Sequence, residues 1–285
     1  MSSAILLNFV DYILEKKLNV DVLTMHYDFY ILPLLNPDGF EYSITRKFYW
    51  SPNRKVYFPK TACPKNVTAC GISLSRNWFL SPDIGKLLLF FTRHFLVRDE
   101  ECDPVYSGSK SLSEEETSGL AKFLDSIALE MLAFINVRGF ENLVTIPYGY
   151  SNQHCNNYPV LMDILSSVHD RVNAEHNKTF FYGTASSFFY NFTGNVADWV
   201  KKKLNTPIVY TIYMNSAHYV LPNAEEVGPR TDELSTMMKE IVLLAGNIYS
   251  PLFNSQARHF IQIFVITIHI SNILLIAILN EFVFI

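Results

Sequence analysis

The sequence predicts a single α/β domain, built on a mixed, largely parallel sheet with helices on both faces. Short apolar runs rich in β-branched and aromatic residues alternate with segments whose apolar residues recur at helical spacing. The chain has 285 residues, of which 49% are hydrophobic and 14% aromatic. That composition is enough to bury one full core, so we expect a globular domain over residues 1–245.

The first half of the chain predicts two helices and one strand. Apolar residues recur at helical spacing over residues 4–17, and residues 28–35 form a short apolar run. This run predicts a buried strand, which the Asn-Pro-Asp-Gly sequence of residues 36–39 closes as a tight turn. A Ser-x-x-Glu capping box at Ser113 begins a second helix.

The second half predicts three strands and two more helices. Residues 131–137, 143–146 and 207–214 have strand composition, whereas residues 159–172 and 231–245 have helical spacing. Because strands and helices alternate, the strands are expected to lie largely parallel to one another.

The C-terminal residues depart from this pattern. We expect a linker at 246–259 and an apolar tail at 260–285, which is long enough to cross a bilayer. Two alternatives are a segment that packs on the core and a wrongly assigned terminal exon. Residues 1–14 have no basic region and no small-residue cleavage site, so they predict a helix and not a signal peptide.

Charge and cysteine content exclude several functions. The net charge of −4, without a basic stripe, argues against nucleic-acid binding. The four cysteines form no Cys-x-x-Cys pair, which argues against a zinc knuckle or a thioredoxin-type site. N-glycosylation triplets at Asn66, Asn177 and Asn191 fit a secretory history.

Several ordered segments resemble the metallocarboxypeptidases of the pancreatic A/B type. They are Asn-Pro-Asp-Gly-Phe at 36–40, Gly-Ile-Ser-Leu-Ser-Arg-Asn-Trp at 71–78, the segment 106–117, Pro-Tyr-Gly-Tyr at 147–150 and the segment 182–199. The resemblance covers most of residues 4–245 and implies the carboxypeptidase fold. It also implies that the family's first strands are missing from this chain.

The resemblance implies that the family's zinc site is absent here. The family holds zinc by His-x-x-Glu and a second His. None of the eight histidines has Glu three residues later, and the position of the second zinc histidine holds Arg138. A guanidinium is a permanent cation that cannot ligate zinc. The family's general base corresponds to Tyr213, and its second-shell carboxylate corresponds to Ser73. We therefore expect no cofactor.

The substrate-binding positions are partly kept. Arg76 and Tyr190 match the pair that holds the terminal carboxylate of a peptide, whereas the companion asparagine is Ser75 and the carbonyl-polarising arginine is Ser51. Ala197 corresponds to the base of the specificity pocket and favours an apolar side chain. An alternative for Arg76 is a structural pairing with an acidic side chain.

The resemblance also suggests a disulfide between Cys70 and Cys102, with two buried thiols as the alternative. Between these cysteines, residues 86–98 contain an apolar run where the family has a polar loop. This run predicts either a partner-binding patch or intron-like read-through.

These features predict a catalytically inactive family member that binds the C-terminus of a peptide or protein. One alternative is an active carboxypeptidase that removes apolar C-terminal residues in a longer form of the chain. Another is an interaction protein anchored in a membrane by residues 260–285. The resemblance implies an extracellular or secretory location, and nothing in the sequence sets the oligomeric state.

Overall fold

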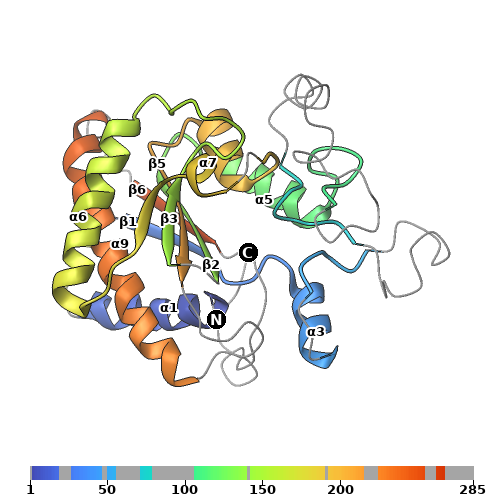
Figure 1. Cartoon of the computed structure of the whole chain (residues 1–285), viewed down its shortest axis with the longest axis horizontal. Helices are drawn as coiled ribbons and strands as arrows, with labels where there is room; N and C mark the ends of the chain where they lie inside the picture. The colour runs from blue at the N-terminus through green and yellow to red at the C-terminus, as the bar shows by residue number, and fades with distance from the viewer. Residues whose placement is uncertain are drawn as a thin grey trace.

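A computed structural model shows a mixed six-stranded sheet between two groups of helices (Figure 1). The structure describes residues 2–18, 27–46, 50–55, 71–78, 106–139, 142–189, 192–214, 224–253 and 261–266. The strands are β1 (Tyr27–Leu32), β2 (Met131–Gly139), β3 (Leu143–Ile146), β4 (Phe181–Thr184), β5 (Ile208–Met214) and β6 (Ile261–Ile266). The longer helices are α1 (Ser2–Leu18), α3 (Pro37–Arg46), α5 (Glu115–Ser126), α6 (Tyr158–His176) and α9 (Ala224–Phe253).

The strand order is β1-β6-β2-β5-β3-β4. The first four of these strands are mutually parallel, and β3 pairs antiparallel with β5 and parallel with β4. The predicted mixed, largely parallel sheet is therefore confirmed. The short edge strand β4 was not among the strands that the sequence predicted.

Two apolar cores cover opposite faces of the sheet. In β5, Ile208, Tyr210 and Ile212 face α1, α6 and α9, whereas Val209 faces α5 and the segments that precede it. This alternation is the period of two that a strand imposes on its side chains. Figure 1 shows α6 and α9 side by side on one side of the sheet and α5 on the other. The prediction of helices on both faces is confirmed.

Residues 36–39 differ from the sequence-based prediction, since they begin helix α3 and do not form a tight turn. Asn36 accepts a hydrogen bond at Oδ1 from the Gly39 N–H (3.0 Å), and Pro37 occupies the first helical position. Both features are typical of a helix N-terminus. The same residue types also favour tight turns. Whether they form a turn or begin a helix depends on the residues that follow them.

The predicted linker at 246–259 is wrong for its first part, because α9 continues to Phe253. Gly246, the first residue of the predicted linker, lies within the helix and allows a close contact. A Cβ added at Gly246 would lie 2.2 Å from the Tyr27 hydroxyl oxygen, and that hydroxyl donates to the Val242 carbonyl (3.4 Å). The glycine therefore lets β1 pack against α9.

The predicted apolar tail at 260–285 also needs correction. Its residues 261–266 form β6, which lies between β1 and β2, parallel to both. Val265 is fully buried in the core. For these residues the core-packing alternative describes the structure, and the rest of the tail lies outside the described residues. Among the helices of the described residues, none has the length and apolar run that crossing a bilayer requires.

Candidate functional site

Arg138 and Tyr213 lie side by side at the carboxyl ends of two neighbouring parallel strands. The register of β2 and β5 pairs these two residues directly. The Arg138 guanidinium carbon lies 5.7 Å from the centroid of the Tyr213 ring, and both side chains are partly exposed. Ligand sites of open α/β sheets form at such carboxyl ends. The fold therefore brings the two predicted residues together at the carboxyl ends of central strands, where a ligand site is expected.

Arg76 comes from an irregular loop at residues 71–78, and Asn77 anchors this loop. The Asn77 Nδ2 donates to the Ser107 carbonyl (2.8 Å) and the Ser113 hydroxyl (2.9 Å), and its Oδ1 accepts from the Thr117 hydroxyl (2.6 Å). These contacts tie the loop to the start of α5. Backbone without regular structure needs such side-chain partners to hold one conformation.

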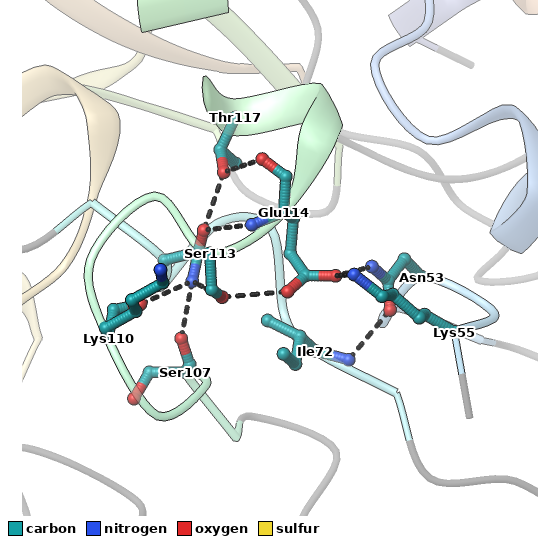
Figure 2. A network of polar contacts seen from close by, with 9 residues as sticks. Asn53, Lys55, Ile72, Ser107, Lys110, Ser113, Glu114 and Thr117 are labelled. Carbon is teal, nitrogen blue, oxygen red and sulfur yellow. Dashed lines mark hydrogen bonds and ion pairs between the residues drawn. The ribbon is translucent and has the colours of Figure 1, made fainter. Parts of the chain in front are cut away.

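Glu114 joins a second loop to this anchor (Figure 2). Its carboxylate is fully buried and accepts from the Asn53 side chain (2.6 Å) and the Ser113 hydroxyl (2.8 Å). Asn53 in turn accepts at Oδ1 from the Ile72 N–H (2.9 Å). The network therefore fixes residues 50–55, which include Ser51, against the loop that carries Arg76.

Gly194 brings a further segment against the backbone of Arg76. Its φ of +84° is in the left-handed region, and a Cβ at this position would lie 2.1 Å from the Arg76 carbonyl oxygen. The Trp78 N–H donates to the Gly194 carbonyl (2.9 Å). Only glycine combines this backbone conformation with so close an approach.

Asp198 is a buried carboxyl group four residues after Gly194, in the short helix α8 (Val196–Trp199). The Gly149 N–H donates to its Oδ1 (3.1 Å) and Oδ2 (2.9 Å). Burial raises the pKa of Asp198 to about 7, against the opposing effects of the Gly149 N–H and the positive charge of Arg76. Asp198 and Arg76 are therefore electrostatically coupled.

Three aromatic rings connect Arg76 to Arg138. The Arg76 guanidinium lies 4.2 Å from the centroid of Phe192, and Phe192 lies 6.2 Å from Phe189. Phe189 lies 5.6 Å from Tyr213, whose ring is the one beside Arg138. We call the rings of Phe189, Phe192 and Tyr213 the aromatic strip. It has a guanidinium at each end.

The structure describes six of the nine predicted site and disulfide residues. Ser51 and Ser75 are partly exposed on the two connected loops, and the Ser75 hydroxyl lies 3.2 Å from that of Ser73. Ala197 is buried in α8, directly before Asp198. The residues outside the described part are Tyr190, Cys70 and Cys102. The proposed disulfide and the role of Tyr190 stay predictions.

The described residues do not fit the zinc ion that the family resemblance implies. By the family resemblance, the guanidinium of Arg138 and the phenol of Tyr213, which pair across β2 and β5, take the positions of an imidazole and a carboxylate. In the part of the chain that the structure describes, no three His, Cys, Asp or Glu side chains cluster closely enough to bind a metal. The side chains that the structure does bring together here are two guanidinium groups and three aromatic rings.

Sequence reasoning did not identify Asp198 and Asn77 as part of the site. Asp198 lies in an otherwise apolar run, Val196 to Val200, and that pattern signals a buried carboxyl group. Asn77 is adjacent to Arg76, but its partners come from a segment 30 or more residues away. No local pattern reveals such a contact.

A family model described as zinc carboxypeptidase matches residues 1–235. Human carboxypeptidase O is 25% identical over 240 residues, which are 82% of this chain and 58% of that protein. Zinc carboxypeptidase A 1 of Anopheles gambiae is 27% identical over 245 residues, or 81% of this chain and 52% of that protein. The chain thus spans little more than half the length of these two relatives.

Two solved structures have a similar fold. Bovine thrombin-activatable fibrinolysis inhibitor, in complex with tick carboxypeptidase inhibitor, superposes with a TM-score of 0.71 at 21% identity, covering 87% of this chain and 78% of that one. Carboxypeptidase A from Helicoverpa armigera superposes with a TM-score of 0.63 at 17% identity. The match covers 77% of this chain and 51% of that one. At these identities the likeness shows the fold alone.

Proposed function

This chain belongs to the zinc carboxypeptidase family, and from that premise we propose that it is a catalytically inactive member that binds the carboxyl terminus of a peptide or protein. The observation that carries the proposal is the pairing of Arg138 with Tyr213 across β2 and β5. By the family resemblance, these positions belong to a zinc ligand and to the general base.

Both replacements remove chemistry that hydrolysis needs. A fixed positive charge at residue 138 repels a metal dication and offers it no lone pair. Residue 213 is a tyrosine and not the carboxylate that, by the family resemblance, takes the proton from water. The two changes lie next to each other in the sheet. Restoring only the residue at position 138 would leave the site without a base. Restoring only the residue at position 213 would leave it without this metal ligand.

The remaining groups favour binding of a carboxylate. Arg76 is partly exposed, and the Asn77 contacts and Gly194 hold its loop in place. A guanidinium binds a carboxylate through two parallel hydrogen bonds. By the family resemblance, Ala197 lies at the base of the specificity pocket, and its small apolar side chain favours an apolar C-terminal residue in the ligand. Such a site holds a peptide end without cleaving it.

Metal content and hydrolysis test the proposed inactivity directly. We would measure zinc in purified protein by atomic spectroscopy and assay hydrolysis of benzoyl-glycyl-phenylalanine with and without added zinc. The expected result is substoichiometric zinc and no turnover. Stoichiometric zinc together with turnover would overturn the proposal, because it would mean that other residues supply the ligands and the base.

Peptide binding tests the proposed ligand. A fluorescent peptide ending in a free carboxylate should bind, and the same peptide with an amidated end should bind roughly tenfold more weakly. Arg76→Gln should remove this difference. The exposed Arg171, which pairs with Glu175 on α6 away from the site, supplies the matched control Arg171→Gln. Equal binding of both peptides to the unaltered protein would refute carboxylate recognition.

A second candidate function is an active carboxypeptidase in a longer form of this protein. It is favoured by the coverage, since the chain spans only 58% and 52% of the two relatives described above. Such a form would need further segments to supply metal ligands and a base. An extended transcript, expressed and assayed as above, distinguishes the two functions.

We propose an extracellular or secretory location for the protein. Asn177 supports it, because this glycosylation triplet lies at the exposed end of α6, where a glycan has room. Protein expressed in mammalian cells should show a glycosidase-sensitive mass that Asn177→Gln reduces.

A further inference from the structure

Arg138 is a cation with no acidic partner among the described residues. The ion pairs in this part of the chain are Lys55–Glu114, His169–Asp170, Arg171–Glu175 and Arg230–Glu233. Arg138 contacts the Tyr213 ring but makes no ion pair with a carboxylate in the part of the chain that the structure describes. A partly buried guanidinium that lacks its own counter-charge favours an anion from a ligand.

Arg76 lies at the other end of the aromatic strip, against Phe192. In the proposed function, Arg76 binds the terminal carboxylate of a peptide. The strip is a continuous row of ring contacts, each between 5.6 and 6.2 Å from centroid to centroid. Phe189 and Tyr213 are partly exposed, so they offer apolar surface to a ligand. A ligand that matches this surface carries negative charge at two points and apolar groups between them.

We propose that the preferred ligand is a peptide end with two carboxylates: the terminal carboxylate, held by Arg76, and an Asp or Glu side chain among its last three residues, held by Arg138. This inference rests on the proposed function and specifies its ligand class. Arg138 thus acts as the second anion site, at the position where the family resemblance places a metal ligand. The site selects acidic peptide ends over neutral ones.

A structural role is the competing account of Arg138. In that account the guanidinium only stacks on Tyr213 and stabilises the ends of β2 and β5. The two accounts differ in a measurable way. A stacking role predicts that Arg138→Gln changes thermal stability and leaves peptide selectivity unchanged, whereas the anion site predicts a loss of selectivity.

The test uses fluorescence anisotropy with two series of labelled hexapeptides that have a free carboxyl end and apolar residues at the positions that are not varied. One series places Glu at each of the last three positions in turn, and the other places Gln at the same positions. We expect at least one Glu peptide to bind roughly tenfold more tightly than its Gln partner, as a charge-assisted hydrogen bond provides. The preference should weaken as salt is raised.

The variants assign the preference to Arg138. Arg138→Gln should abolish the discrimination between Glu and Gln while keeping the discrimination between free and amidated peptide ends. Arg138→Lys should keep part of the first preference, because it retains the charge but not the bidentate geometry. Circular dichroism confirms that each variant is folded. Equal affinity for the Glu and Gln peptides at every position would overturn the inference.

The same peptides separate this inference from the proposed function. If amidation and Arg76→Gln weaken binding but Glu and Gln bind equally, the second anion site is refuted and the proposed function stands. If Glu is preferred through Arg138 but amidation has no effect, terminal-carboxylate recognition is refuted, and with it the two-carboxylate ligand. If neither difference is observed, both proposals fail.

Discussion

At the scale of single residues, Asp198 is the group whose chemistry depends most on its surroundings. It is fully buried, its two oxygens share one hydrogen bond from the Gly149 N–H, and the positive charge of Arg76 acts on it. Because burial dominates, its pKa rises from 3.8 to about 7. The folded protein therefore holds a proton that the unfolded chain releases at moderately acidic pH.

This difference predicts the pH dependence of stability. Between the unfolded and folded pKa values of Asp198, the folded state binds more protons, so the free energy of unfolding falls as the pH rises. The contribution of Asp198 to the free energy of unfolding is fully present below the pKa of the unfolded chain and is lost above about pH 7. Its upper limit is about 4 kcal/mol. Asp198→Asn should flatten this slope in urea unfolding at a series of pH values. An unchanged slope would show that Asp198 ionises normally.

Gly194 leads to a second prediction at this scale. Gly194→Ala should destabilise the protein by about 2 kcal/mol, because its φ of +84° is strained for alanine and the added Cβ would meet the Arg76 carbonyl. It should also weaken the binding of peptides with free carboxyl ends.

Gly119→Ala is the matched control for this measurement. A Cβ at Gly119, in α5, meets no atom within 4 Å, and alanine favours a helix. Thermal unfolding should therefore show the Gly119 variant equally or more stable. A similar loss of stability in both variants would contradict a specific role for Gly194.

At the scale of elements, the loops that carry the site depend on one buried carboxylate. Residues 50–55 and 71–78 have no regular secondary structure, and Glu114 connects both of them to α5 through Asn53 and Ser113. Figure 2 shows these contacts converging on the N-terminal end of the helix. The loops therefore gain their order from α5 and not from their own backbone pairing.

Removing this carboxylate should loosen both loops. Glu114→Ala leaves the Asn53 amide without a buried acceptor, and we expect a loss of about 2–4 kcal/mol in the free energy of unfolding. Glu115→Ala, at the exposed neighbouring position, is the control and should cost well under 1 kcal/mol. Urea unfolding compares the two variants, and equal losses would refute the special role of Glu114.

At the scale of the whole molecule, β6 makes the C-terminal part of the chain essential to the sheet. It lies between β1 and β2, so its loss would separate β1 from the rest of the sheet. Both neighbouring strands would then have unpaired backbone groups next to apolar side chains. A membrane anchor, by contrast, can be removed without affecting the folded domain.

This contrast yields a prediction for a shortened chain. A chain ending at His259 should lose cooperative thermal unfolding, and Val265→Asp should destabilise the full chain by at least about 3 kcal/mol, since Val265 is fully buried. Leu129→Asp is the control, because Leu129 is 95% exposed. A shortened chain that unfolds cooperatively at the same temperature would show that β6 contributes nothing to the sheet.

The main elements and the family follow from the sequence. Strand composition placed β2, β3 and β5, and the helical period of 3.6 placed α1 and α6, to within a few residues. The residues at positions 138 and 213 also follow from the sequence and its resemblance to the family, with no knowledge of their contacts.

The position of the apolar run at 261–266 and the surroundings of Asp198 follow from the folded chain and not from local sequence. A short apolar run has the same composition in a central strand, a membrane segment or a core helix, so its place depends on which strands are free to pair with it. The ionisation of Asp198 likewise depends on burial by distant segments. Both properties arise from contacts between residues far apart in the chain, which no local pattern encodes.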